Sequence, residues 1–193
     1  QLYWTEDAVY PRRVRRLDRA DGSVATLAAG RLVNRPRAVA VAGEAGLLFW
    51  AETLSGRLRR AAVDGANLAD IVTSGYGIDD RDDSAEMNVL GLTLTTAPPR
   101  LFWTDAARDD LFSSGFDGAD LRPLRVGGTA AAFAAGIAVD PVANALYWAD
   151  VAGEAIWRSA LDGSDARVVV GRTAGLLEPW GVAVDPQRRI LYW

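Results

Sequence analysis

The 193-residue sequence contains no cysteine and no histidine, and all 21 of its basic residues are arginine. The absence of cysteine excludes disulfide bonds, thiolate metal sites and a cysteine nucleophile. The absence of histidine excludes the commonest general base, the commonest zinc ligand and the side chain that usually changes charge near neutral pH. The most frequent catalytic and pH-sensing side chains are therefore missing from this chain.

The remaining composition is that of an ordinary globular protein with a small negative charge. Half of the residues are hydrophobic, 24% are charged, and the net charge is -4. Proteins that bind nucleic acid through its phosphates usually carry the opposite balance, so we expect no nucleic-acid partner. No apolar run approaches the about 20 residues of a membrane-spanning helix, so we also expect no membrane span in this segment. No signal segment opens the chain, which leaves its localisation unknown.

An aromatic motif containing tryptophan recurs along the whole chain. Its four full copies are Leu2–Glu6, Leu48–Glu52, Leu101–Asp105 and Leu146–Asp150, and a fifth copy begins at Leu191. The intervals between successive tryptophans of the motif are 46, 53, 45 and 45 residues. An Asp-Gly pair follows each full copy, and a segment of small and aliphatic residues precedes the later copies. Three markers in a constant order indicate an internal repeat.

Each repeat is predicted to form four short β-strands. In 136–140, aliphatic residues alternate with small ones, which is the period of a strand with one crowded face. The Tyr-Trp segment that follows has high β propensity. Residues 155–158 form a polar and apolar third strand, and Asp162-Gly163 predicts a tight turn before a fourth strand at 168–170. Four strands per about 45 residues, repeated, predict an all-β fold of β-propeller blades.

These residues resemble the YWTD repeats of the low-density lipoprotein receptor class. The motifs that carry the resemblance are the Leu-Tyr-Trp-Thr-Asp-like segments, Gly-Val-Ala-Val-Asp-Pro at 181–186 and Leu-Asp-Gly-Ser at 161–164. The resemblance covers the whole chain and is strongest over 136–193. It implies a six-bladed propeller with the Tyr-Trp motif on the second strand of each blade. It also implies an extracellular or cell-surface protein that binds other proteins or packs against its own modules.

The sequence departs from the family pattern in its first half. Glu6 and Glu52 replace aspartate in the aromatic motif, and Ala42 and Thr95 stand where the later units have Asp140 and Asp185. If these upstream aspartates brace neighbouring blades, the bracing should be weaker in the first half of the chain.

The chain is predicted to be one partial propeller domain over 1–193. Its units lie near 2–34, 35–87, 88–133 and 134–177, with the start of another at 178–193, and three of them are uninterrupted. Six blades would need about 270 residues. Closure into a four-bladed ring would require residues 191–193 to take the position of residues 2–4. We therefore expect an open arc of a longer, processed or truncated propeller, whose partners include its own missing blades.

Two charged regions are interpreted as solvent-exposed. Five carboxylates gather at 79–86, namely Asp79, Asp80, Asp82, Asp83 and Glu86. They lack the spacing of a calcium-binding EF-hand loop, so we interpret the segment as an acidic loop and leave cation binding open. The arginines at 12–19 and 57–60 are interpreted as solvated outer strands, with an anion-binding rim as the alternative. The repeated aromatic residues, Trp148 among them, are predicted to pack between blades.

The residues that do not repeat indicate a binding site. In propellers the loops that enter the innermost strands surround the mouth of the central channel, and loops commonly carry function. Six side chains there differ from unit to unit, namely Arg35, Arg37, Asn88, Phe133, Glu178 and Trp180. Arginine and aromatic residues are the usual anchors of protein interfaces. We therefore predict a non-catalytic scaffold that presents this face, with Trp180 partly exposed, to a protein or peptide.

Two alternatives remain open from the sequence. A metal-dependent hydrolase of the lactonase kind could recruit Asn34, Asn88, Asp140 and Glu178. Asn34, Asn88 and Glu178 precede inner strands whereas Asp140 follows one, so the four residues need not lie at the same end of the channel. The chain could also be a purely structural segment that completes a larger ring. We expect no cofactor, no bound metal and no enzymatic activity, because fold analogy alone does not establish a reaction.

Overall fold

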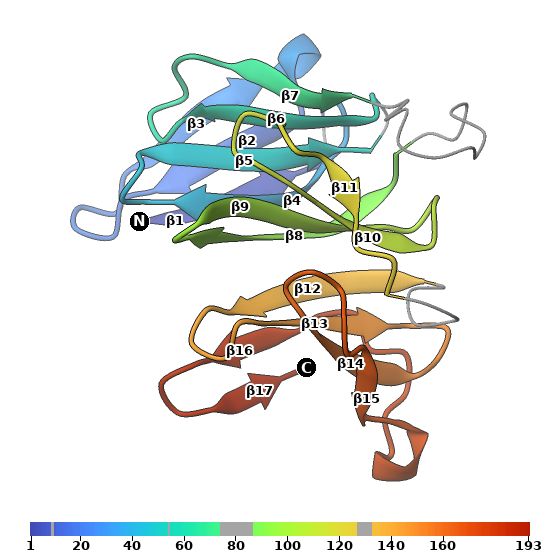
Figure 1. The fold of residues 1–193 in the computed structure, drawn as a ribbon. Coiled ribbons are helices and arrows are strands. Elements are labelled where there is room, and N and C mark those ends of the chain that lie inside the picture. The colour runs from blue at the N-terminus through green and yellow to red at the C-terminus, as the bar shows by residue number, and fades with distance from the viewer. Residues whose placement is uncertain (9, 54, 74–86, 127–132) are drawn as a thin grey trace.

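The computed structural model describes residues 1–8, 10–53, 55–73, 87–126 and 133–193 (Figure 1). The acidic segment 79–86 lies outside the described residues. Two 3-10 turns, η1 (Gly30–Leu32) and η2 (Arg172–Ala174), accompany the strands. Among the described ranges, no helix has the length and apolarity needed to cross a membrane.

The strands form five antiparallel sheets that follow one another along the chain. The first sheet contains β1 (Leu2–Glu6), β2 (Arg13–Leu17) and β3 (Val24–Ala29). The second contains β4 (Pro36–Ala42), β5 (Leu47–Glu52), β6 (Arg57–Ala62) and β7 (Ala69–Thr73). The third contains β8 (Val89–Thr96), β9 (Pro99–Asp105), β10 (Asp110–Ser114) and β11 (Arg122–Pro123). The fourth contains β12 (Ala134–Asp140), β13 (Ala145–Asp150), β14 (Ala155–Ala160) and β15 (Arg167–Val170), and the last contains β16 (Ala183–Asp185) and β17 (Ile190–Tyr192).

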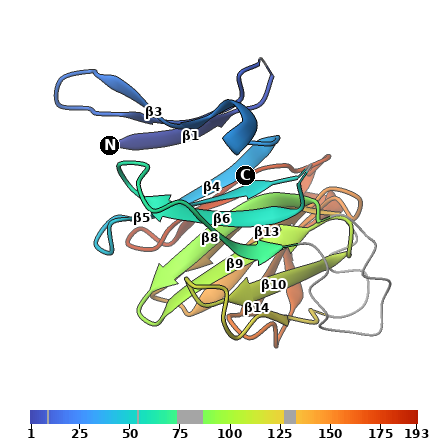
Figure 2. The same cartoon turned by 90° about the horizontal axis from the view of Figure 1, so that it is seen from above.

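The sheets are arranged as blades of an open β-propeller. The inner strands β4, β8, β12 and β16 pack side by side in chain order, and β1 of the first sheet lies against β4. Figure 2 shows the first sheet, in blue, at one edge of the array. Consecutive antiparallel sheets of four strands are the blade architecture expected from the repeat. The predicted fold class, an open arc of propeller blades, is therefore confirmed, whereas the six-blade total stays a prediction.

The core lies between neighbouring sheets and is built around the repeated tryptophans. Trp50, Trp103 and Trp148 are each at most 1% exposed. Trp50 packs with Val14 and Ala28 of the sheet before it, and Trp103 and Trp148 lie in the corresponding clusters of the next two interfaces. The second, third and fourth sheets thus bury the same side chain against the sheet before, which confirms the predicted packing role for these three copies, whereas Trp4 is partly exposed and Trp193 is 59% exposed.

Small residues on the inner strands allow neighbouring backbones to meet. A methyl group added at Gly91 of β8 would lie 2.5 Å from the carbonyl oxygen of Ala135. One added at Gly136 of β12 would lie 2.7 Å from the carbonyl oxygen of Trp180, which already accepts the Gly136 N–H at 2.8 Å. The alternation of small and aliphatic residues therefore reflects the crowding of strands near the propeller axis.

The threonine of the aromatic motif links neighbouring sheets. The Thr104 hydroxyl accepts the Gly91 N–H at 3.0 Å and donates to the carbonyl oxygen of Ala135 at 2.7 Å. The Thr5 hydroxyl donates in the same way to the carbonyl oxygen of Arg37, again at 2.7 Å. The hydroxyl thus satisfies inner-strand backbone groups that would otherwise be left unpaired between two sheets.

The upstream aspartates act within their own hairpins. The Asp140 carboxylate accepts the N–H groups of Val142 and Ala143, both at 2.9 Å, in the turn between β12 and β13. The Asp185 carboxylate accepts two N–H groups of the equivalent turn after β16. Short polar side chains commonly stabilise turns in this manner. The hydrogen bonds of both aspartates are thus local, and their bracing of neighbouring blades stays a prediction.

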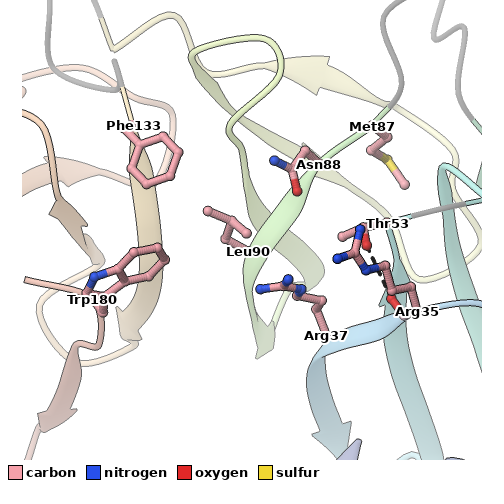
Figure 3. Close-up of a pocket in the computed structure, with 8 residues that line it drawn as sticks. All are labelled: Arg35, Arg37, Thr53, Met87, Asn88, Leu90, Phe133 and Trp180. Carbon is pink, nitrogen blue, oxygen red and sulfur yellow. Dashed lines mark hydrogen bonds between the residues drawn. The ribbon is translucent and has the colours of Figure 1, made fainter. Parts of the chain in front are cut away.

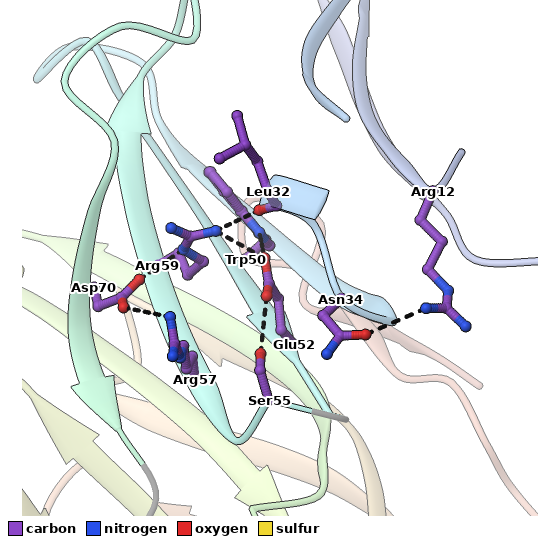
Figure 4. Close-up of polar contacts among 9 residues, drawn as sticks. All are labelled: Arg12, Leu32, Asn34, Trp50, Glu52, Ser55, Arg57, Arg59 and Asp70. Carbon is purple, nitrogen blue, oxygen red and sulfur yellow. Dashed lines mark hydrogen bonds and ion pairs between the residues drawn. The ribbon is translucent and has the colours of Figure 1, made fainter. Parts of the chain in front are cut away.

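Arg59 is not a solvated surface residue, so the interpretation of the 57–60 cluster was wrong at this position. Only 12% of its side chain is exposed. Its guanidinium lies 2.7 Å from the Asp70 carboxylate and 3.3 Å from the Glu52 carboxylate, and it also donates to the carbonyl oxygen of Leu32 (Figure 4). It stacks over Trp50, 5.9 Å from the ring centre. The cation therefore joins the second sheet to the segment that follows the first.

Candidate binding site

The residues before each inner strand are held at equivalent backbone positions. The carbonyl oxygens of Arg35, Asn88 and Phe133 accept N–H groups from the ends of β5, β9 and β13, respectively. The donors are Thr53 at 3.2 Å, Ala106 at 3.0 Å and Val151 at 3.1 Å. Each link joins the start of an inner strand to the end of the second strand in the same sheet. The backbone at this end of the array is therefore repeated from sheet to sheet, although the side chains are not.

Five of the six predicted site residues line one pocket, which we call the mouth pocket (Figure 3). Its volume is about 320 Å³, and it lies where the inner strands begin. The lining residues are Arg35, Arg37, Thr53, Met87, Asn88, Leu90, Phe133 and Trp180. The sixth predicted residue, Glu178, is exposed and is not among those that line the pocket. Whether the pocket binds a partner remains a prediction.

Arginine and amide groups form one side of the mouth pocket. The Arg35 guanidinium lies 3.5 Å from the Asp7 carboxylate, which also pairs with Arg12 at 3.0 Å. The Arg37 guanidinium has no hydrogen-bond or ion-pair partner among the residues that the structure describes, and neither has the Asn88 carboxamide. None of the described residues that line the pocket is a carboxylate. This side therefore presents positive charge and unused hydrogen-bonding groups to solvent.

An aromatic pair forms the opposite side. The Phe133 and Trp180 rings pack edge to face, with centres 5.7 Å apart and planes at 89°. Trp180 remains 54% exposed, and its carbonyl oxygen is held by the Gly136 N–H. Figure 3 shows Leu90 between this pair and the arginine side. The prediction that Trp180 is partly exposed and shares a face with Arg37 and Phe133 is confirmed.

Sequence reasoning missed three of the lining residues, Thr53, Met87 and Leu90. Thr53 immediately follows the acidic residue of the aromatic motif. Since the second strand of a blade ends where the first begins, this position should have been added to the candidates. Leu90 occupies the repeat position of Arg37 and Trp180, so alignment of the units would have identified it as well.

The four residues considered for a lactonase-like metal site are not brought together. The Asn34 carboxamide oxygen accepts from Arg12 at 3.2 Å (Figure 4). Asp140 stabilises the turn at the opposite end of β12 from Phe133, whereas Asn88 lines the mouth pocket. Within the described ranges, no cluster of three or more carboxylates is placed to hold a metal ion. The Asp79–Glu86 candidate for cation binding lies outside those ranges.

Comparison with known proteins supports the fold. No family model matches the chain. A chain from the crystal structure of a nidogen/laminin complex superposes with a TM-score of 0.76 at 21% identity, over 95% of this chain and 64% of that one. An auxiliary nutrient binding protein from Bacteroides thetaiotaomicron VPI-5482 gives 0.69 at 13% identity, over 94% and 50%.

A lyase is also among the similar structures. A catalytically inactive virginiamycin B lyase from Staphylococcus aureus with quinupristin gives a TM-score of 0.62 at 12% identity, over 88% of this chain and 52% of that one. This chain therefore spans about half to two thirds of the length of these proteins. Such likenesses at low identity are evidence of a common fold, and they place the chain among the β-propellers.

Proposed function

We propose that this chain is a non-catalytic binding scaffold, a partial propeller of the YWTD-repeat kind whose mouth pocket receives a protein or peptide partner. One observation carries the proposal. Side chains that do not repeat, from three different units, gather in a single pocket, and Trp180 there is 54% exposed. The repeated tryptophans Trp50, Trp103 and Trp148 are instead buried in packing. An exposed aromatic residue beside unpaired polar groups is characteristic of interface anchors.

The similar structures are compatible with this class of function. One belongs to a nidogen/laminin complex and another is an auxiliary nutrient binding protein. The lyase among them shows that the same fold also hosts catalysis, so fold likeness alone does not choose between the two. The binding role is favoured by the mouth pocket, because the lining residues that the structure describes are cationic, amide and apolar, and none of them is a carboxylate that could act as a general base or hold a metal.

Selection of peptides on the immobilised chain tests the proposal. A phage library that displays random 12-residue peptides would be panned against the wild-type chain. Selected peptides should bind the wild type and Trp193→Ala but lose binding to Trp180→Ala. Trp193 is a matched control because it is 59% exposed and lines a different pocket, formed with Leu191 and Tyr192.

The controls also separate two ways in which a peptide could bind. A propeller arc exposes strand edges, and peptides can add to such edges through backbone hydrogen bonds. Edge binders would keep their affinity for both tryptophan variants. A selection that yields only such peptides would contradict a binding role for the mouth pocket and would favour a purely structural segment.

A further inference from the structure

We infer that the mouth pocket recognises an acidic peptide segment, in which an aspartate or glutamate lies beside a large apolar residue. The carboxylate would bind Arg37, and the apolar side chain would pack on Leu90, Phe133 and Trp180. This inference rests on the proposed function and deepens it by naming the chemistry of the partner. Three features of the pocket support it.

The first feature is the Arg37 guanidinium, which has no carboxylate partner in the part of the chain that the structure describes. The chain as a whole carries a net charge of -4, yet the described residues that line the mouth pocket include two guanidinium groups and no carboxylate. Arg59 and Arg100, by contrast, are each within 2.7 Å of a carboxylate of their own sheet. Arg37 has no such partner among the described residues. A guanidinium binds a carboxylate through paired, charge-assisted hydrogen bonds. An acidic side chain of the bound peptide would therefore supply a counterion for Arg37.

The second feature is the apolar wall opposite the arginines. The edge-to-face contact with Phe133 orients the Trp180 ring while leaving it 54% exposed. Leu90 lies between this aromatic pair and Arg37 in Figure 3. Covering such a wall with an aliphatic or aromatic side chain removes apolar surface from water. The cationic and apolar parts share one pocket of about 320 Å³, so one short segment must supply both groups.

The third feature favours a peptide over a small anion. Asn88 lines the pocket beside Leu90, and its carboxamide has no partner among the described residues. A carboxamide offers both donors and an acceptor, which matches the N–H and C=O groups of an extended backbone. A free inorganic anion would use neither the acceptor of Asn88 nor the apolar wall. The combination therefore fits a peptide that carries its negative charge on a side chain.

A charge exchange on the selected peptides tests the inference. Peptides whose binding depends on Trp180 should contain aspartate or glutamate close to phenylalanine, tryptophan, leucine or isoleucine. Arg37→Glu should weaken the most enriched peptide at least about tenfold, the effect of losing a hydrogen bond to a charged group. The same peptide with lysine in place of its acidic residue should bind Arg37→Glu better than it binds the wild type. Fluorescence anisotropy of the labelled peptides gives these affinities.

Arg19→Glu is the matched control for charge. Arg19 is exposed in the turn between β2 and β3, at the end of the blades opposite the mouth pocket. This variant changes the net charge equally and should leave the affinity within about twofold. Enrichment of neutral or basic peptides that still require Trp180 would overturn the acidic inference and leave the proposed function standing. The absence of any peptide that requires Trp180 would overturn both.

Discussion

A methyl group at Gly118 should disrupt the contact between the second and third sheets. Gly118 belongs to the Asp-Gly turn of the third sheet and has a φ of +85°. A Cβ atom there would overlap the carbonyl oxygen of Ile71 in β7 and lie 2.9 Å from its carbonyl carbon. The equivalent residue of the first sheet, Gly22, has a φ of +73° and open space around it. The two positions share a backbone conformation but differ in their neighbours.

This difference separates two energetic costs of a glycine-to-alanine substitution. Both variants place an alanine in the left-handed region, which costs about 1–2 kcal/mol. Gly118→Ala must also move the backbone of β7 away from the turn, and overpacking of this kind costs about 1–3 kcal/mol more. The free energy of unfolding should therefore fall by about 2–5 kcal/mol for Gly118→Ala and by about 1–2 kcal/mol for Gly22→Ala.

Urea unfolding followed by tryptophan fluorescence measures both values. Buried tryptophans lie at three of the inter-sheet contacts, so their emission reports the separation of sheets. Thermal unfolding should agree, with the Tm of Gly118→Ala lower by about 2–4 °C for each additional kcal/mol. Equal losses in the two variants would show that the turn does not meet β7 as described, and would refute the proposed contact between sheets.

Three further predictions concern stability. Arg59→Ala should cost about 1.5–3 kcal/mol in urea unfolding, because the buried Glu52 carboxylate loses a charge-assisted hydrogen bond and Trp50 loses the guanidinium that stacks on it. Arg19→Ala should cost no more than about 0.5 kcal/mol, and similar losses in the two variants would argue against the ion pair between Arg59 and Glu52. Trp148→Ala should cost about 3–5 kcal/mol, as for other large core aromatics, and a loss below about 1 kcal/mol would contradict its inter-sheet position. The hydrogen bond from Arg100 lowers the pKa of Asp120 below its ordinary value of 3.8. The ionised Asp120 therefore stabilises the folded chain fully above pH 3.8, and this stabilisation is lost as the pH falls through the lower pKa of the folded state. Asp120→Asn should therefore lower the Tm near neutral pH but not in strong acid, and a constant difference across the pH range would exclude this linkage.

Buried ion pairs and hydrogen bonds between sheets could not be predicted from the amino-acid sequence. Arg59 lies in a run of arginines that resembles a solvated outer strand, and only the fold places Leu32, Glu52 and Asp70 around its guanidinium. Thr104 likewise meets Ala135 only because two sheets stack with their inner strands side by side. These contacts join residues 7 to 31 positions apart on different strands or segments, and no local pattern encodes them.

The sequence by itself determined the repeat, the strands, the Asp-Gly turns and the burial of the motif tryptophans in the second, third and fourth sheets. These features depend on short-range periodicity and on packing that every unit shares, so five copies of one motif report them redundantly. It also indicated which side chains do not repeat. Only the tertiary structure decided that Arg37 and Trp180 line one pocket and that Glu178 stays outside it. The physical reason is that the relative position of blades follows from packing between sheets, which brings together residues far apart in the chain.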